Sequence, residues 1–280
     1  MSQLNNILTI DVEESFHRND LLLSTGQREL LGGRLVEQTE RLVSLLKAYG
    51  QRGTFFVLGE VAKEYPQLVM RFVEEGFELG IHGYHHELVY EQEREEFRHQ
   101  TRKAKALLEE MVGKEIVGFR APSWSITERS LWALKILADV GFQYDSSILP
   151  ARAYLGGIPW SNTRIHRREE AEIIEVPPSI IKIGRLRLPF SGGLYLRILP
   201  YSFIQFCIKK LNKKGIPAVI YLHPWELDPE LPRLRLKWKG RFALYHNLNT
   251  VQAKVERLLR EFSFAPIQEV LKDAGSFRGP

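Results

Sequence analysis

Three segments near the start of the chain show its structural pattern: NILTID at residues 6–11, RLVEQTERLVSLLKAY at 34–49 and GTFFVL at 53–58. The first and third are short apolar runs, the third rich in β-branched and aromatic residues, and both predict buried strands. The middle segment carries apolar residues at helical spacing and is followed by Gly50, so it predicts an amphipathic helix. A strand, a helix and a second strand in this order predict two parallel strands joined by a crossover helix.

The same alternation continues along most of the chain. Further strands are predicted at 77–81, 115–119, 141–144 and 218–222, and further helices up to about 75 and at about 93–112, 127–140, 201–214 and 249–261. Residues 150–200 differ, because they combine Pro and Gly with short β runs such as EIIEV at 172–176. We therefore expect an α/β fold with a mostly parallel sheet and a hairpin-rich insertion around 150–200.

Composition limits the class of protein. The 280 residues are 44% hydrophobic and 26% charged, which is typical of a globular domain, and no apolar run is long enough for a transmembrane helix. The first residues lack the pattern of a signal peptide, and a single cysteine, Cys207, excludes an internal disulfide. These features predict a cytoplasmic location.

The net charge is +5, and basic residues are densest at 164–170, 209–214 and 235–241. Such runs are usually solvated faces, so no nucleic-acid partner is predicted. The third run is also a candidate for contact with a phosphate or with an anionic membrane surface, which would suit a lipid-linked substrate.

Five chemically active residues follow the ends of predicted strands: Asp11, His82, Arg120, Asp145 and His223. In barrels and open sheets of parallel strands, ligands and catalytic groups lie at the carboxyl ends of the strands. Core packing alone does not readily produce this pattern. It predicts one site at that edge of the sheet.

A carboxylate pair and a histidine pair suggest metal-dependent chemistry. Asp11 and Glu13 project to the same side of an extended segment, so one can ligate a cation while the other serves as general base. Alternatively, these acids open a helix, where the dipole favours them. His82 and His86 have the i, i+4 spacing of a ligand pair, with His85 at the rim. Two imidazoles and one carboxylate leave a position open for water, as in a catalytic zinc site.

Arg120 and His223 are the candidate supporting groups. A buried Arg120 needs an acidic partner, and Asp11 and Asp145 are available, although a purely structural ion pair fits as well. His223 ends a strand and suits a general acid, but a packed histidine is the alternative. A serine hydrolase is not expected, because the serines near these residues lie in no nucleophile-elbow pattern. Cys207 lies in an apolar helical stripe and is predicted to be core.

In this order, the residues resemble the polysaccharide deacetylase family, the nodulation-type carbohydrate esterases. The resemblance lies in TIDV at 9–12, the H-x-x-x-H of His82 and His86, RAP at 120–122, Asp145 in YDSS and Leu222-His223. The segments DVEE at 11–14 and LHPWELDPELPR at 222–233 resemble a subgroup associated with bacterial exopolysaccharide synthesis.

The resemblance implies a distorted (β/α)7-type barrel, one catalytic domain over 1–280, and a C-terminal extension at 227–280 packed on it. It also implies a divalent cofactor, usually Zn²⁺, and a hydrolase acting on carbon–nitrogen bonds other than peptide bonds. The expected reaction releases acetate from an N-acetylhexosamine in a glycan or exopolysaccharide precursor. The sequence gives no indication of the oligomeric state.

One departure from the family pattern changes the assignment of ligands. The family's second aspartate aligns with Val12, which cannot bind a metal. The resemblance then implies Asp11 as base and Glu13 as ligand with His82 and His86, and Glu14 is the alternative ligand. Arg120 and Asp145 would align Asp11, and His223 would be the acid. The expected substrate contacts are Ser123, Trp124, Tyr84 and Trp225.

Two other functions remain open at this point. Relatives with a D-x-E arrangement include hydrolases of cyclic imides and ureides, where the broken bond is also an amide. A non-catalytic glycan-binding protein of an assembly complex would keep the barrel and its aromatic rim but release no acetate.

Overall fold

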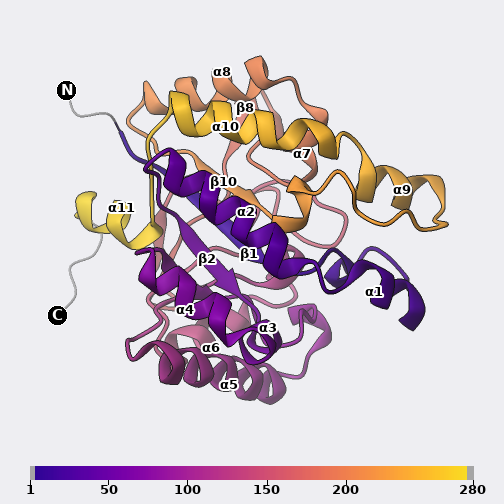
Figure 1. Cartoon of the computed structure of the whole chain (residues 1–280). Coiled ribbons are helices and arrows are strands. Elements are labelled where there is room, and N and C mark those ends of the chain that lie inside the picture. Colours follow the sequence, from indigo (N-terminus) through magenta and orange to yellow (C-terminus); the bar gives the residue numbers. More distant parts are fainter. Residues whose placement is uncertain (1–3, 276–280) are drawn as a thin grey trace.

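A computed structural model describes residues 4–275, and its centre is a nine-stranded sheet (Figure 1). The strand order is β10-β1-β2-β3-β4-β5-β7-β6, with β11 pairing β1 on a branch off this path. The strands are β1 (Asn6–Val12), β2 (Thr54–Val57), β3 (Glu78–Ile81), β4 (Gly118–Phe119), β5 (Tyr144–Asp145), β6 (His166–Arg168), β7 (Ile173–Glu175), β10 (Val219–Leu222) and β11 (Phe264–Ala265). Every pairing in this sheet is parallel except β6 with β7, which confirms the mostly parallel α/β fold.

The region 150–200 is only partly an insertion. It holds the antiparallel hairpin of β8 (Ile180–Ile183) and β9 (Leu186–Pro189), as expected, and also β6. However, β7 pairs with β5 in parallel and so belongs to the main sheet. Residues 173–176 are buried at the sheet, because Ile173 and Ile174 join the two hydrophobic clusters on its faces and β7 packs against α6 (Trp132–Val140).

Irregular segments connect the two ends of the curved sheet. The Ser179 backbone N–H donates to the carbonyl of Val219 on β10 at 3.1 Å, and the Tyr221 N–H donates to Ser191 at 2.8 Å. Gly192 lies so close to β10 that a Cβ there would lie 1.7 Å from the Tyr221 carbonyl oxygen. The glycine pair at 192–193 therefore permits close backbone approach, which fits a distorted barrel.

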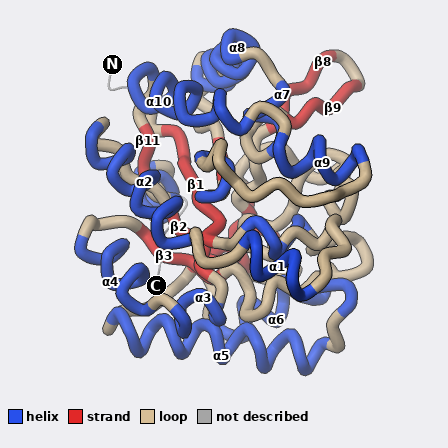
Figure 2. Tube along the Cα trace, turned by 45° about the vertical axis from the view of Figure 1, so that its right-hand side comes forward, coloured by secondary structure: helices blue, strands red, loops and turns tan. Residues whose placement is uncertain are grey.

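Helices cover the outside of the sheet (Figures 1 and 2). The predicted ones are α2 (Leu35–Ala48), α5 (Arg94–Val112), α6, α8 (Tyr201–Asn212) and α10 (Val251–Glu261). The single helix predicted up to about residue 75 is two helices, α3 (Gly59–Glu64) and α4 (Pro66–Glu74), because Pro66 starts a new helix. Four short helices were not predicted: α1 (Thr25–Leu31), α7 (Leu194–Ile198), α9 (Trp238–Tyr245) and α11 (Ile267–Asp273). In Figure 1, α1 and α9 both lie on the side toward which the β2 arrow points.

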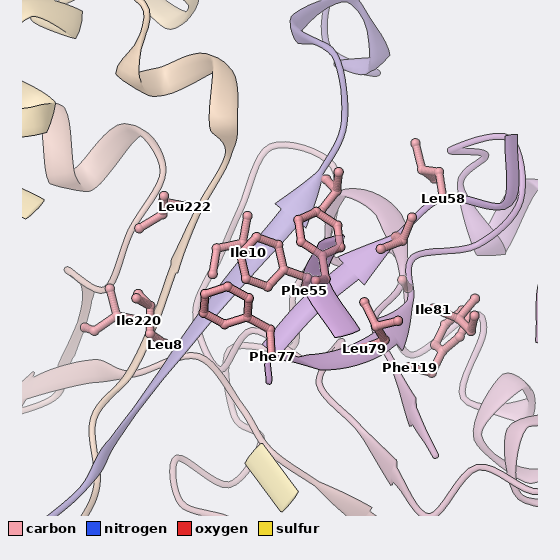
Figure 3. Close-up of a cluster of buried hydrophobic side chains, with 14 of the residues drawn as sticks. Leu8, Ile10, Phe55, Leu58, Phe77, Leu79, Ile81, Phe119, Ile220 and Leu222 are labelled. Atoms are coloured by element: carbon pink, nitrogen blue, oxygen red, sulfur yellow. The ribbon is translucent and has the colours of Figure 1, made fainter. Parts of the chain in front are cut away.

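The two faces of β1 pack into different hydrophobic clusters. Leu8 and Ile10 face the helices, where they join the large core drawn in Figure 3. Ile7 belongs to a second cluster with Phe56 and Tyr144 on the opposite face. Because alternate residues of a strand share a face, Asp11 continues the row of Ile7, at the carboxyl end of the strand. The buried acid therefore sits over the inner side of the curved sheet.

Candidate active site

Glu13, His82 and His86 form a buried three-residue cluster. Their ligand atoms all lie within 4.8 Å of one another. The Glu13 Oε2 atom is 2.6 Å from Nε2 of His86 and 3.4 Å from Nε2 of His82. His82 follows β3, Glu13 follows β1, and each of the three residues is at most 5% exposed. Two imidazoles and one carboxylate converging on one point are a donor set suited to a divalent metal.

Neighbouring groups orient the His82 imidazole and hold the His86 backbone. Nδ1 of His82 lies 2.9 Å from the Arg120 carbonyl oxygen, so this nitrogen carries the proton and Nε2 keeps its lone pair toward Glu13. His86 has a left-handed backbone, with φ of 58°. The Asn19 side chain donates to the His86 carbonyl at 3.1 Å and accepts from the Ser123 hydroxyl at 2.9 Å. These contacts hold the His86 loop against the loop after β4.

The electrostatics of the cluster favour the ligand-competent forms. Burial opposes ionisation of Glu13, but the facing His86, His223 and His82 side chains outweigh it and hold its pKa well below the usual value. Burial lowers the pKa of His86, against the pull of Glu13. An ionised carboxylate and a neutral imidazole are the forms that bind metal. The donor set therefore fits a divalent ion.

Asp11 and Arg120 form a buried ion pair beside this cluster. The Arg120 guanidinium donates to Asp11 Oδ1 at 2.8 Å and to the Thr9 hydroxyl at 2.7 Å. Its other nitrogens donate to the backbone carbonyl and the hydroxyl of Ser146 at 3.0 and 2.7 Å. Arg120 is fully buried, and its partners leave it one orientation. Of its two candidate acidic partners, the structure selects Asp11.

The prediction that Arg120 contacts Asp145 is wrong: in the described part of the chain, the ion pair of Arg120 is with Asp11. Among the described residues, the Asp145 carboxylate accepts from the Ser147 hydroxyl and, at 3.3 Å, from its backbone N–H. It lies beside Glu175, which accepts from the Ile148 N–H at 3.0 Å. Burial raises the pKa of Asp145 to about 6, and burial with the Asp145 charge raises that of Glu175 well above its usual value. The physical reason is strand alternation, which turns Ser146 rather than Asp145 toward Arg120.

His223 is held by a chain of buried charges that the sequence did not reveal. Its Nδ1 lies 3.0 Å from Glu226 Oε2, and Glu226 Oε1 lies 3.0 Å from Nε of the buried Arg197. The Nε2 atom faces Asp11 Oδ2 and Glu13 Oε1, each at 3.8 Å. Burial opposes the charged imidazolium, but these carboxylates outweigh it and raise the His223 pKa to about 9. His223 is thus a protonated group aimed at the carboxylate cluster.

A cavity of about 240 Å³ is lined by Asp11, Glu13, His82, His86 and His223. Its remaining wall includes Ser123, Trp124, Tyr154, Tyr221 and Trp225. Trp225 stacks on the His223 ring, with centroids 5.5 Å apart, and Trp124 packs edge-on against Tyr221. An aromatic-walled cavity over a carboxylate–histidine cluster is a shape that can receive a sugar ring.

Tyr84 was expected on this rim, and the structure places it elsewhere. It is 6% exposed, packs on Gly59 at the start of α3, and lies 4.0 Å from the Lys103 ammonium of α5. Glu14, the alternative ligand, also lies outside the cluster. Its Oε1 accepts from the Gly33 and Leu35 N–H groups at 2.9 and 3.2 Å, so it caps the start of α2.

Comparison with known proteins identifies the family. The polysaccharide deacetylase model matches residues 32–144, and a domain of unknown function (DUF3473) matches residues 146–272. Residues 32–144, which are 113 of the 280 residues, therefore form a polysaccharide deacetylase domain. The two matched regions share one sheet, because β10 and β11 of the second flank β1, next to β2 of the first.

The curated relatives match part of the chain. A peptidoglycan-N-acetylglucosamine deacetylase from Bacillus cereus is 33% identical over 99 residues, which are 35% of this chain and 36% of that protein. A peptidoglycan deacetylase from Helicobacter pylori is 30% identical over 109 residues, covering 39% and 36%. The chain therefore spans well under half the length of these relatives.

Two solved structures share the fold over nearly the whole chain. The PuuE allantoinase superposes with a TM-score of 0.66 at 14% identity, covering 97% of this chain and 90% of that one. A Mycobacterium smegmatis protein assigned to the polysaccharide deacetylases has a TM-score of 0.64 at 19% identity, covering 99% and 92%. These similarities confirm the distorted barrel-type α/β fold.

Proposed function

We propose that the chain hydrolyses the N-acetyl amide of an N-acetylhexosamine in a glycan or exopolysaccharide precursor. One observation carries the proposal: the Glu13–His82–His86 cluster, the Asp11–Arg120 pair and His223 converge at one aromatic-walled cavity. The names of the curated relatives, which are glycan deacetylases, support the substrate class. A single catalytic domain over 1–280 with an extension from 227 and a cytoplasmic location remain predictions.

The cluster would hold a divalent ion, and we propose Zn²⁺ because of its two imidazole donors. When bound, such an ion supplies Lewis-acid polarisation of the acetamide carbonyl and lowers the pKa of a water molecule. Glu13, His82 and His86 are the proposed ligands. His82 is oriented by the Arg120 carbonyl, and metal ligands generally need such an outer partner.

The chain's own acid–base groups then divide the proton transfers. Asp11, held by Arg120, accepts a proton from the attacking water as the oxygen of that water bonds to the carbonyl carbon. His223 gives its proton to the amide nitrogen as the carbon–nitrogen bond breaks, which yields acetate and a free amino sugar. A backbone N–H near Ser123 is the proposed donor to the developing oxyanion.

The aromatic wall supplies binding and water exclusion. Trp225 stacks on His223, so it keeps the acid in one orientation, and Trp124 on the opposite loop provides a second apolar surface. A sugar ring that lies against the half-buried Trp124 at the cavity wall buries its C–H face while its polar groups stay near the carboxylates. We propose Ser123, Trp124 and Trp225 as substrate contacts, and Tyr84 as a packing residue.

The decisive test combines metal analysis with a substrate screen. Purified protein is expected to contain about one equivalent of divalent metal per chain and to release acetate from chitooligosaccharides. Ring opening of a cyclic imide without acetate release would instead favour the amidohydrolase alternative, which shares the barrel of the allantoinase. Glycan binding without turnover of either substrate would favour the non-catalytic alternative.

A further inference from the structure

A basic strip surrounds the start of α9, outside the catalytic cavity. It consists of five exposed side chains: Arg233, Arg235, Lys237, Lys239 and Arg241. The sequence has no Asp or Glu between Glu230 and Glu256. Some arginines elsewhere form ion pairs, such as Arg34 with Asp228 at 2.7 Å, but within residues 4–275 none of the five does. The strip is therefore a concentration of uncompensated positive charge.

Large apolar side chains lie among these charges. Trp238 is 73% exposed and Phe242 is 42% exposed, and their i, i+4 spacing places them on one face of α9. The loop before α1 adds Leu22, which is fully exposed. Leu22 lies beside α9, because its neighbour Leu21 packs against Gly240 of that helix. The Cδ2 atom of Leu21 is 3.1 Å from the position that a Cβ on residue 240 would occupy.

Buried apolar side chains and hydrogen bonds support this surface from beneath. Leu21, Leu31, Leu244 and Tyr245 form one buried cluster with Trp225 of the cavity wall. The Tyr245 hydroxyl accepts from the Leu234 N–H at 2.9 Å and donates to the Pro232 carbonyl at 2.7 Å. Ala243 of α9 also lines the cavity. The exposed residues thus stand on a packed base that continues into the catalytic site, and Figure 2 shows α9 and α1 on the same side of the molecule.

We propose that this surface, the basic strip with Leu22, Trp238 and Phe242, docks the protein onto an anionic lipid membrane. Lys and Arg are attracted by anionic headgroups, while Trp, Phe and Leu insert at the boundary of the acyl chains. A nucleic acid would satisfy the charges but leave the fully exposed Leu22 without an apolar partner. Every helix within residues 4–275 is too short or too polar to span a bilayer. Docking would bring the cavity mouth near the membrane, where lipid-linked glycans are found.

The test measures co-sedimentation with vesicles. Wild-type protein should bind phosphatidylcholine vesicles containing phosphatidylglycerol, and bind vesicles of phosphatidylcholine alone far more weakly. Each basic residue near such a surface changes binding about fivefold, so removing three should weaken it about a hundredfold. The strip variant is R235S/K239S/R241S. The matched control removes three basic residues at the end of α8: K209S/K213S/K214S.

A second variant, W238A/F242A, tests the apolar part. Its defect should persist at high salt, where the attraction between charges is screened. Equal weakening by the α8 control, or no preference for phosphatidylglycerol, would overturn the proposal, as would tight DNA binding without vesicle binding. Acetate release from soluble chitooligosaccharides by the strip variant should equal that of wild type. This readout separates a failure of docking from a failure of the proposed reaction.

Discussion

Nδ1 of His82 lies 2.9 Å from the carbonyl oxygen of Arg120, whose guanidinium donates to Asp11 at 2.8 Å. One residue therefore orients a proposed metal ligand through its backbone and the proposed base through its side chain. Because the two contacts use different parts of Arg120, a side-chain substitution separates them.

We predict that Arg120→Lys lowers kcat for acetate release about 10²–10⁴-fold while metal remains bound. Lysine keeps the charge but cannot reproduce the planar fork that contacts Thr9, Asp11 and Ser146 together. The His82 contact survives because it uses the backbone. Steady-state kinetics and elemental analysis on the same preparation give both quantities. Loss of metal together with activity would show that the whole site depends on this side chain.

The assignment of the third ligand predicts contrasting effects of two adjacent substitutions. Glu13→Gln should weaken zinc affinity by more than the roughly 10–100-fold that is typical when a residue hydrogen-bonded to a metal ligand is replaced. Glu14→Gln should leave zinc affinity near wild type but lower the free energy of unfolding by about 1 kcal/mol, because Glu14 caps α2. Zinc titration and thermal unfolding of both variants provide the measurement. The reverse pattern would make Glu14 the ligand.

The position of the site could be predicted from sequence because it follows from the geometry of parallel strands. Each of His82, Arg120 and His223 directly follows a buried apolar run, and the carboxyl ends of parallel strands meet at one edge. The D-x-E spacing likewise predicted that Asp11 and Glu13 face the same side. Local periodicity was sufficient for these residues.

Contacts that depend on packing could not be predicted in this way. Whether Arg120 meets Asp145 or Ser146 depends on which of two adjacent residues faces inward at the strand end. Arg197 reaches Glu226 from α7, in a region without a regular pattern, although the His223–Glu226 spacing of three was visible in the sequence. Tyr84 lies between the two proposed ligands His82 and His86 in the sequence, yet its ring packs over Gly59 and not in the cavity.

Helix α9 was missed for a local reason. The segment RLRLKWKGR at 233–241 alternates apolar and basic residues, which is the period of a strand, and Gly240 disfavours a helix. Tertiary packing of Leu244 and Tyr245 against Leu21 and Leu31 stabilises the helix instead. Packing of a few large side chains therefore overrides the propensity of a short segment.

The His223–Glu226 contact predicts a dependence on the leaving group. Glu226→Gln should lower kcat for the glycan amide with little change in KM, because a misaligned His223 protonates the leaving amine poorly. Hydrolysis of 4-nitrophenyl acetate should be retained, because 4-nitrophenolate leaves without a proton. Partial recovery in Glu226→Asp would support a positioning role.

Two control measurements distinguish loss of the acid from loss of the structure of the site. His223→Ala should show the same split between the two substrates, since it removes the acid itself. Thermal unfolding must also be compared, because Glu226→Gln leaves the buried Arg197 without its carboxylate partner. An equal loss on both substrates would mean that Glu226 maintains the structure of the site and does not serve the acid.

The last prediction concerns stability. Asp145 and Glu175 are fully buried neighbours at the ends of β5 and β7, and burial raises the pKa of both, that of Asp145 to about 6. A carboxyl pKa raised above its unfolded value of about 4 means that the folded state holds the proton more tightly. The stability from this proton is complete below that unfolded pKa and is lost as the pH rises through the folded one.

The melting temperature should therefore fall as the pH rises from about 4 through about 6 and beyond, and Glu175→Gln should reduce that fall. Glutamine resembles the protonated Glu175 and can still accept from the Ile148 N–H, while it removes the second ionisable group beside Asp145. Glu128→Gln, at an exposed carboxylate, serves as the matched control and should leave the slope unchanged. An identical slope in wild type and Glu175→Gln would contradict the raised pKa of Glu175, because replacing a group that gains a proton on folding must change the pH dependence of stability.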